Sequence, residues 1–311
     1  MLSDQWYAVT TTSELGAKPL GIRRFARDLV LWRDPDGQAC CAVDACPHRG
    51  AALSRGRVHK GCLECPYHGL RFEAEGACVA VPAHPKSPIP PALHLSTLPV
   101  REAHGLVWVF NGQDPKVELP WDAAFEAELK QDGGVFVDLS DEFDVSYLRV
   151  MENLTDFHHV AHVHRTTAPV PAEITAFSAR REGLNVYVTG TLGNPGERGH
   201  MHAGTHIAAP SLAQLHFAGL ARFAVCATPI DADNVWLFAR YSQTAVRFPG
   251  LEGLLTRLLG AVDYRLLQRL QDVPIWRSQR LKDPGEIGQY TLLPADEGIR
   301  LYFEIHQELS R

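Results

Sequence analysis

Two short loops in the N-terminal half carry residues that bind metals. They are Cys46–Gly50, with the sequence CPHRG, and Cys65–Gly69, with the sequence CPYHG. Each loop offers one thiol and one imidazole, and 16 residues separate His48 from Cys65. Each also contains proline and glycine, which are typical of tight loops that expose backbone N–H groups. The spacing therefore predicts one metal site shared by two loops.

The four ligands of this site would be Cys46, His48, Cys65 and His68. Two thiolates and two imidazoles suit a [2Fe–2S] cluster in which two histidines replace two cysteines on one iron, as in a Rieske centre. A structural zinc ion with the same four ligands is the alternative. Zinc fingers usually separate the cysteine pair from the histidine pair, whereas the two types alternate here. The cluster is therefore the preferred interpretation.

Four histidines fall within seven residues of the second half, a composition typical of metal sites. They are His158, His159, His162 and His164. His158 and His162 are four positions apart and would share one face of a helix. His159 and His164 are five positions apart, about 140° around an ideal helix. Helical geometry alone thus favours the first pair.

A length of 311 residues predicts about two domains, 1–120 and 121–311, whose strands and helices must position these ligands. In the first, short strands separated by turn residues predict a small all-β domain, a rigid platform for four ligands. Its expected strands are Trp6–Thr10, Leu29–Trp32, Ala39–Val43 and Val107–Phe110, with a hairpin of Leu70–Phe72 and Cys78–Val81.

In the second domain, strand patterns accompany two helical regions, near 143–165 and 251–282. This combination predicts a twisted antiparallel sheet with flanking helices, so that the chain as a whole is α+β. The expected strands are Ile174–Arg180, Asn185–Thr191, Leu212–Phe217, Phe223–Thr228, Val235–Tyr241 and Ile299–Ile305.

The N-terminal half resembles the Rieske domain of Rieske-type non-haem iron oxygenases, particularly the vanillate O-demethylase-like branch. The phrases that carry this resemblance are Pro19–Gly21, Cys46–Leu53, Cys65–Leu70 and Gly105–Trp108. Respiratory-chain Rieske proteins have an extra cysteine in each loop, and the two form a disulfide. Ala51 and Tyr67 stand at those places here. The resemblance implies the lower-potential oxygenase or ferredoxin type of centre.

The histidine-rich segment is similar to the iron motif of the same oxygenases, Asn-x-x-Asp-x-x-His-x4-His. The match falls on Asn153, Asp156, His159 and His164. The resemblance implies that His159 and His164 bind a mononuclear Fe(II), with Asn153 in a supporting position. It also implies that the helix either widens into a π-like turn or ends near Val160–Val163, since ligands five positions apart do not share a face.

A carboxylate would complete the facial triad of a non-haem Fe(II) site, leaving the opposite face open for O2 and substrate. Gln271–Trp276 resembles the Asp-Val-x-Ile-Trp phrase of 3-ketosteroid 9α-hydroxylases and sterol 7-desaturase-type enzymes, which implies that Asp272 is this third ligand. Asp272 could instead cap a helix beginning at Pro274. Asp263 and Asp283 are weaker substitutes for the ligand.

Asp156 lies three residues before His159, within reach of its second ring nitrogen. In the family the matching aspartate also meets a Rieske histidine of the neighbouring subunit, here His68. The resemblance thus implies a homotrimer in which Asp156 is the electron-transfer bridge between one chain's cluster and the next chain's iron. A purely structural role for Asp156 is the alternative.

Composition and motif content limit the possible binding partners, location and electron donors of the protein. The net charge of −6 gives no basic footprint for nucleic acid. The N-terminus has no signal-peptide pattern, and the charge-free segment around 206–221 is too polar for a membrane span. The five cysteines outside the loops predict reduced thiols in a cytoplasmic protein. The sequence contains neither a dinucleotide fingerprint nor the four-cysteine spacing of plant-type ferredoxins, so a separate reductase, with or without a ferredoxin, must supply electrons.

Together these features predict the terminal oxygenase component of a multi-component Rieske monooxygenase. It would use O2 to hydroxylate a largely apolar cyclic or polycyclic small molecule. O- or N-demethylation of the vanillate-demethylase type and desaturation are the enzymatic alternatives. A Rieske electron carrier is the alternative without catalysis, and the complete second iron motif argues against it.

Overall fold

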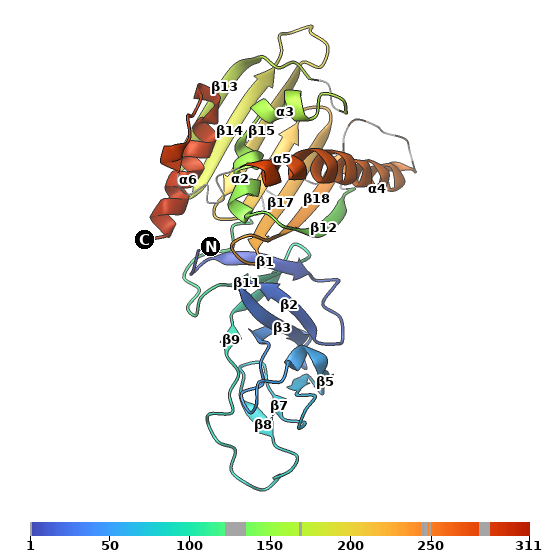
Figure 1. Cartoon of the computed structure of the whole chain (residues 1–311). Coiled ribbons are helices and arrows are strands. Elements are labelled where there is room, and N and C mark those ends of the chain that lie inside the picture. The colour runs from blue at the N-terminus through green and yellow to red at the C-terminus, as the bar shows by residue number, and fades with distance from the viewer. Residues whose placement is uncertain are drawn as a thin grey trace. The chain divides into compact units, whose positions relative to one another are not determined.

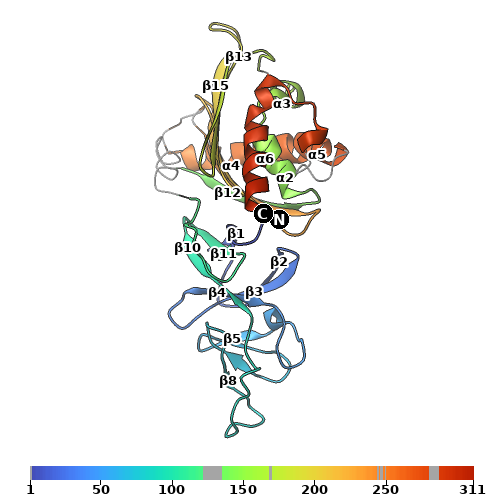
Figure 2. The ribbon, with the colours of Figure 1, turned by 90° about the vertical axis from the view of Figure 1, so that its left-hand side faces the viewer.

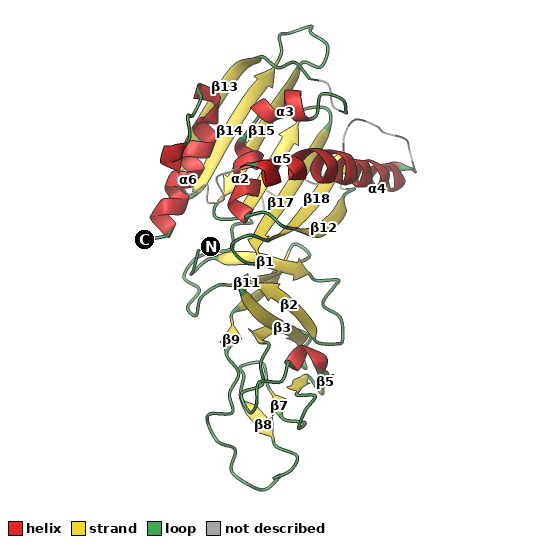
Figure 3. Cartoon of the chain, in the orientation of Figure 1, coloured by secondary structure: helices red, strands yellow, loops and turns green. Residues whose placement is uncertain are grey.

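The computed structural model describes residues 2–121, 135–167, 170–243, 250–279 and 287–311, together with residues 245 and 248. The chain divides into two compact units, Ser3–Glu118 and Leu119–Arg311. The regular elements of the first are almost all short strands joined by loops, and the second combines a large sheet with helices (Figures 1 and 3). No described helix is long and apolar enough to span a membrane.

The N-terminal unit contains three small antiparallel sheets, with the strand orders β1-β11-β10, β2-β3-β4-β9 and β5-β6-β7-β8. Their bounds are β1 Trp6–Thr11, β2 Leu20–Arg24, β3 Arg27–Arg33, β4 Ala39–Val43, β5 Arg57–His59, β6 Cys62–Glu64, β7 Arg71–Phe72, β8 Cys78–Ala80, β9 Thr97–Leu98, β10 Val100–Ala103 and β11 Leu106–Phe110. The predicted all-β domain is confirmed, including the β7–β8 hairpin.

The two cysteine-containing loops leave the ends of strands in this unit. The first follows β4 and the second follows β6. Trp32 and Phe72 are fully buried and belong to one core cluster that also includes Cys46 and Cys65. Close packing of the core fixes the position of its side chains. The two cysteines are therefore held at the edge of a rigid apolar core.

The C-terminal unit is built on one seven-stranded antiparallel sheet, ordered β12-β18-β17-β16-β15-β14-β13. The bounds are β12 Val137–Phe143, β13 Ile174–Glu182, β14 Asn185–Leu192, β15 Met201–Ala208, β16 Leu212–Phe217, β17 Ala221–Pro229 and β18 Val235–Gln243. Consecutive strands from β13 to β18 are neighbours, so most connections are short hairpins. The sequence did not predict β12 and β15.

The described helices of this unit are α2 Tyr147–Thr155, α3 His158–Val163, α4 Glu252–Val262, a π-helix Asp263–Asp272, α5 Val273–Ser278 and α6 Glu297–Leu309. Short 3-10 turns lie at Leu53–Arg55, Ile287–Gln289 and Pro294–Asp296. Figure 2 shows α2, α5 and α6 on one face of the sheet. The predicted α+β class with flanking helices is confirmed.

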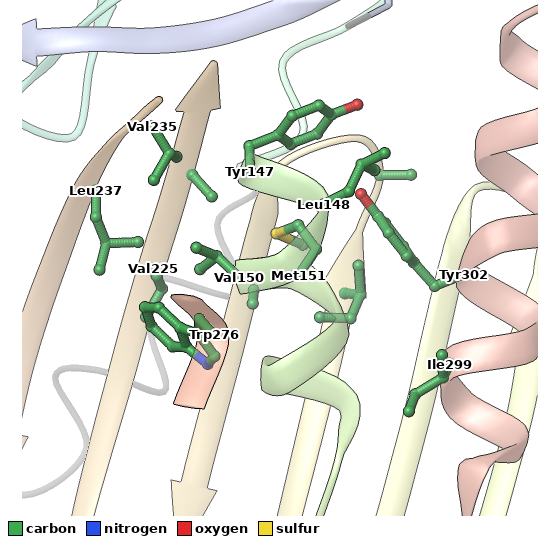
Figure 4. Close-up of a cluster of buried hydrophobic side chains, with 14 of the residues drawn as sticks. Tyr147, Leu148, Val150, Met151, Val225, Val235, Leu237, Trp276, Ile299 and Tyr302 are labelled. Atoms are coloured by element: carbon green, nitrogen blue, oxygen red, sulfur yellow. The ribbon is translucent and has the colours of Figure 1, made fainter. Parts of the chain in front are cut away.

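The main core of this unit lies between the sheet and these helices. Val150 and Met151 of α2, Val225 of β17, Trp276 of α5 and Tyr302 of α6 all belong to it (Figure 4). The Ser146 side chain caps α2 by accepting from the backbone N–H of Leu148, and fixes where the helix begins. Burial of these large side chains anchors α2, and with it the segment that follows.

The prediction of a strand at Ile299–Ile305 is wrong, because these residues lie within α6. Apolar and charged residues alternate there as in a strand, but Ile299, Tyr302 and Phe303 recur at helical spacing and are buried together. Gly298 allows the close approach of this helix, since a Cβ at that position would lie 2.5 Å from Val188 Cγ2 of β14.

Candidate metal centres and the adjoining cavity

The two N-terminal loops have the same backbone hydrogen bonds. The Cys46 N–H donates to the Ala51 carbonyl (2.9 Å), and the Gly50 N–H donates to the Cys46 carbonyl (2.8 Å). In the second loop, the N–H of the cysteine and that of the glycine make the equivalent bonds, at 2.8 and 3.1 Å. Gly50 and Gly69 also share a left-handed backbone, with φ of 72° and 71°. Equivalent residues are thus held in equivalent geometry.

Within each loop, the cysteine is buried and the histidine is exposed. The His48 and His68 rings lie 4.7 Å apart between centroids, so the two loops present their imidazoles side by side. Burial and the neighbouring Cys65 raise the pKa of the Cys46 thiol to about 11, although the backbone N–H of His48 acts in the opposite direction. Two buried sulfurs beneath two exposed imidazoles match a cluster with different ligands on its two irons.

The spread of these four ligands also separates the cluster from zinc. A tetrahedral zinc ion holds its ligand atoms within about 4 Å of one another, given its bond lengths. Among the described residues, one group of three or more His, Cys, Asp and Glu side chains brings its ligand atoms within 4.8 Å, and that group lies in the C-terminal unit. The N-terminal ligands fit a binuclear cluster better than a single ion. All seven cysteines are free thiols.

The group in the C-terminal unit consists of His159, His164 and Asp272. Asp272 Oδ1 lies 3.3 Å from His164 Nε2 and 4.0 Å from His159 Nε2. The two imidazole rings meet edge to face, 5.4 Å apart between centroids. Both Nε2 atoms and one carboxylate oxygen therefore converge, which is the donor set of a facial triad.

The local structure explains why histidines five positions apart can meet. The helix α3 ends at Val163, one of the two outcomes predicted for this segment, and His164 lies just beyond it. Its ring is therefore not held to the helical spacing. His162 is exposed, and neither His158 nor His162 lines the cavity described below.

Asp272 has the environment of a ligand and not that of a helix cap. Its side chain makes no capping hydrogen bond to α5, and its backbone continues the preceding helix. Its carboxylate is buried, and Oδ1 has no hydrogen-bond partner among the described residues. Burial raises the pKa of Asp272, and His159 and His164 partly oppose this shift. A buried carboxylate oxygen aimed at two imidazoles fits a cation at their centre.

The outward nitrogens of both imidazoles face acceptor oxygens, although that of His159 makes no hydrogen bond of good geometry in the described structure. His159 Nδ1 lies 3.4 Å from Asp156 Oδ2, while Asp156 Oδ1 accepts from the backbone N–H of His158 at 2.6 Å. His164 Nδ1 lies 2.8 Å from the amide oxygen of Gln271. Such partners fix ring orientation and tautomer in metal sites. The sequence predicted the contact of Asp156 but not that of Gln271, whose only signal is its position beside Asp272.

The charges of Asp156 and His159 reinforce each other. Burial lowers the pKa of His159, but Asp156 and Asp272 outweigh burial, and the result is a raised pKa. Burial likewise raises the pKa of Asp156, but the contact with His159 outweighs it, and the result is a lowered pKa. The pair favours a positive charge at the position where a metal cation would stand.

Of the two substitute ligands, Asp263 lies nearby but outside the converging group, and Asp283 lies outside the described residues. Asp263 begins the π-helix that Asp272 ends. A π-helix, with hydrogen bonds between residues i and i+5, has about 4.4 residues per turn, so nine residues make slightly more than two complete turns. In an α-helix of 3.6 residues per turn they would make two and a half. Asp263, Gln268 and Asp272 therefore share one face.

This face and the triad border a cavity of about 400 Å³. Its lining is mostly aliphatic and aromatic, and comes from α2, α3, the sheet, α4 and the π-helix. Phe157, Phe223 and Trp276 are among its aromatic residues, and Asn153 contributes at the end of α2. A site of this size and polarity is typical of one that binds a small apolar molecule.

Comparison with known proteins identifies the N-terminal domain and the fold of the chain. Residues 5–99 match the model of the Rieske [2Fe-2S] domain, so the N-terminal unit is a Rieske domain. Over 99% of its length the chain superposes on a crystal structure of dicamba monooxygenase bound to 3,6 dichlorosalicylic acid, with a TM-score of 0.80, 23% identity and 98% of that chain covered. The chain therefore has the fold of dicamba monooxygenase, and the predicted combination of a Rieske domain with an α+β second domain is confirmed.

Particular relatives are similar over part of their length. The oxygenase component of dicamba O-demethylase from Stenotrophomonas maltophilia is 35% identical over 171 residues, which cover 54% of this chain and 49% of that protein. The vanillate O-demethylase oxygenase subunit of a Pseudomonas species is 33% identical over 168 residues, covering 52% and 45%. The chain thus spans about half the length of the curated relatives it matches. NdmA of Pseudomonas putida CBB5 with caffeine shares the fold, with a TM-score of 0.79, 23% identity and coverage of 97% and 91%.

Proposed function

We propose that this chain is the terminal oxygenase component of a multi-component Rieske monooxygenase. The observation that carries the proposal is that one chain holds two complete ligand sets, with an apolar cavity beside the second. Cys46, His48, Cys65 and His68 would hold the [2Fe–2S] cluster, and His159, His164 and Asp272 would hold Fe(II). An electron carrier would need the first set alone.

When bound, the cluster supplies one electron at a time, and the mononuclear iron supplies the position where O2 is activated. The chain's own residues do the rest. Asp156 and Gln271 keep the two imidazoles in orientation through their outward nitrogens. The cavity side chains exclude water and hold a substrate C–H bond next to the open face of the triad.

The substrate class that this cavity supports is a small, largely apolar ring compound. The relatives act, by their names, on dicamba and vanillate, and NdmA has been crystallised with caffeine. We include hydroxylation of a ring or alkyl carbon and demethylation that begins by hydroxylating a methyl group. Polycyclic compounds with fused rings are one subset of this proposed substrate class.

The electron donor is proposed to be a separate reductase, with or without a ferredoxin. We also propose a homotrimer in which Asp156 of one chain is close to His68 of the next. The exposed His68 and the direct contact of Asp156 with His159 support this route. Co-expression of His68→Ala with Asp156→Asn tests it, since an intact cluster in one chain would then serve an intact iron site in another. Recovered turnover in the mixture supports the route, and its absence contradicts it.

The principal test is an iron count followed by a substrate screen with a surrogate reductase in heavy-oxygen gas. An oxygenase should hold about three iron atoms per chain and place one heavy oxygen atom in the product. For demethylation, the labelled atom appears in the released one-carbon fragment. About two iron atoms per chain would identify an electron carrier. A product that has lost two hydrogens and gained no oxygen would identify a desaturase.

A further inference from the structure

The C-terminal cavity contains a carboxylate that no described residue neutralises. Asp263 lines the cavity, and no hydrogen bond or ion pair reaches its side chain from the described residues. The other two carboxylates of the cavity differ in this respect, because Asp156 and Asp272 each lie beside an imidazole. Asp263 also lies outside the group of converging ligands.

A second unpaired acceptor accompanies it. The amide oxygen of Gln268 is buried and has no hydrogen-bond partner among the described residues. Gln268 lines the cavity and lies on the same face of the π-helix as Asp263 and Asp272. Buried acceptors in native proteins are almost always satisfied, so the Gln268 oxygen calls for a donor from a ligand in the cavity.

The charge of the cavity points to the kind of donor. No lysine or arginine is among its described lining residues. With Fe(II) bound, the charges of the metal, Asp272 and Asp156 would sum to zero, and Asp263 would add one negative charge. Burial and the nearby Asp272 raise the pKa of Asp263 to about 7, so above that pH a charged carboxylate faces an apolar space. A ligand with one positive charge would make the cavity neutral.

We propose that Asp263 binds the protonated nitrogen of the substrate, and that the substrate is therefore a largely apolar cyclic amine. Gln268 accepts a second N–H from the same nitrogen. This inference rests on the proposed function, because it assigns the cavity to the substrate. It further implies that aromatic carboxylates bind poorly, since they would bring a second uncompensated negative charge beside Asp263.

Direct binding of three probes tests the inference without turnover. Naphthylmethylamine, naphthylmethanol and naphthoate share one ring system and differ in the charge of the attached group. Each would be titrated calorimetrically into the iron-loaded protein without oxygen, at about pH 8, where the amine is protonated and Asp263 ionised. The amine should bind about 10-fold tighter than the alcohol, as expected for a charged hydrogen bond, and naphthoate should bind more weakly than either.

Asp263→Asn then identifies the residue responsible. This variant should lower the affinity for the amine about 10-fold and leave that for the alcohol within about twofold. Glu252→Gln is the matched control, because it removes a negative charge from the start of α4, outside the cavity lining. It should retain the preference for the amine. Both variants should keep the iron content of the parent.

Two results would overturn the inference: equal affinity of the parent protein for amine and alcohol, or an unchanged preference in Asp263→Asn. Loss of one iron per chain in Asp263→Asn would also overturn it, by making Asp263 a metal ligand. These results are independent of the oxygenase proposal, which fails instead on a low iron count or unlabelled products. An amine preference in a protein without oxygenation would support amine binding by Asp263 in this cavity and reject the oxygenase function.

Discussion

The two candidate metal sites of this chain are built in different ways. The N-terminal site is local, since its four ligands lie within Cys46–His68, and backbone hydrogen bonds shape both of its loops. The C-terminal site joins the end of α3 to the end of a π-helix far along the chain. The side chains of Asp156 and Gln271 contact its candidate ligands.

This difference determines what each site depends on. Backbone-built loops need glycine at particular φ angles, and most neighbouring side chains can vary. A site oriented by side chains needs each partner, and it also needs helices of the right type and end point. The C-terminal site should therefore be sensitive to single side-chain changes that leave the N-terminal site intact.

The largest effect is expected for Asp272→Ala. Loss of the only carboxylate in the converging group should remove the mononuclear iron and lower turnover by more than about a thousandfold. The visible spectrum of the Rieske centre should be unchanged, because its ligands lie in the other unit. Iron analysis and the spectrum of the same sample would check both parts. Normal turnover in this variant would show that Asp272 is not a ligand of the triad.

The next effect concerns Asp156→Asn, which keeps the size of the side chain and removes its charge. Both metals should stay bound, while turnover falls by about a hundredfold or more, through loss of the acceptor for His159 Nδ1 and of the proposed electron route. Single-turnover oxidation of the reduced cluster measures this step. His158→Ala is the control, since it keeps the backbone N–H that donates to Asp156. An unchanged rate in Asp156→Asn would contradict the bridging role.

Gln271→Ala should weaken iron binding less than the loss of an iron ligand would. Removing the acceptor of His164 Nδ1 should weaken iron binding by about 10-fold to 100-fold, as measured by competition with a chelator. Gln271→Glu keeps an acceptor oxygen at that place and should retain most of the affinity. Equal losses in the two variants would show that the amide oxygen does not orient His164.

The N-terminal site can be tested by a pair of glycine variants. Gly50→Ala and Gly69→Ala both force alanine into a left-handed backbone, which costs about 1–2 kcal/mol. Gly69→Ala should cost more, because its Cβ would lie 3.1 Å from Pro82 Cγ, whereas Gly50 faces open space. Denaturant unfolding followed at the cluster absorbance would rank them. The reverse ranking would mean that Pro82 does not restrict the second loop.

The same contrast explains what could be predicted from the sequence. The Rieske loops could be identified because backbone-built sites keep ligands and glycines at fixed short spacing. The pairing of His159 with His164 could not be derived from helical geometry, which favoured His158 and His162. It required the family motif, because the sequence pattern does not show that α3 ends at Val163.

Other features depended on contacts that sequence patterns do not record. The period of residues 263–272 does not distinguish a π-helix from an α-helix, so the shared face of Asp263, Gln268 and Asp272 could not be predicted. Gln271 has no motif of its own. The strand pattern at Ile299–Ile305 was overridden by burial of one helical face of α6.

The smallest expected effect is a pH dependence of stability that comes from Asp263 in the C-terminal unit. Asp263 has a folded-state pKa of about 7, above its ordinary value of 3.8, so the folded protein holds the proton more tightly than the unfolded chain. Stability should therefore fall as the pH rises from about 4 to 7.

The variant Asp263→Asn cannot lose this proton. It should be more stable than the parent at about pH 8, by about 1 kcal/mol or 2–4 °C, and equally stable at about pH 4. Burial also raises the pKa of Glu152 to about 7, but Glu152 is present in both the parent and the variant. The difference in stability between them therefore isolates the contribution of Asp263. Thermal unfolding after chelation of the mononuclear iron measures it, and equal melting temperatures at both pH values would show that the Asp263 carboxylate is already neutralised within the protein.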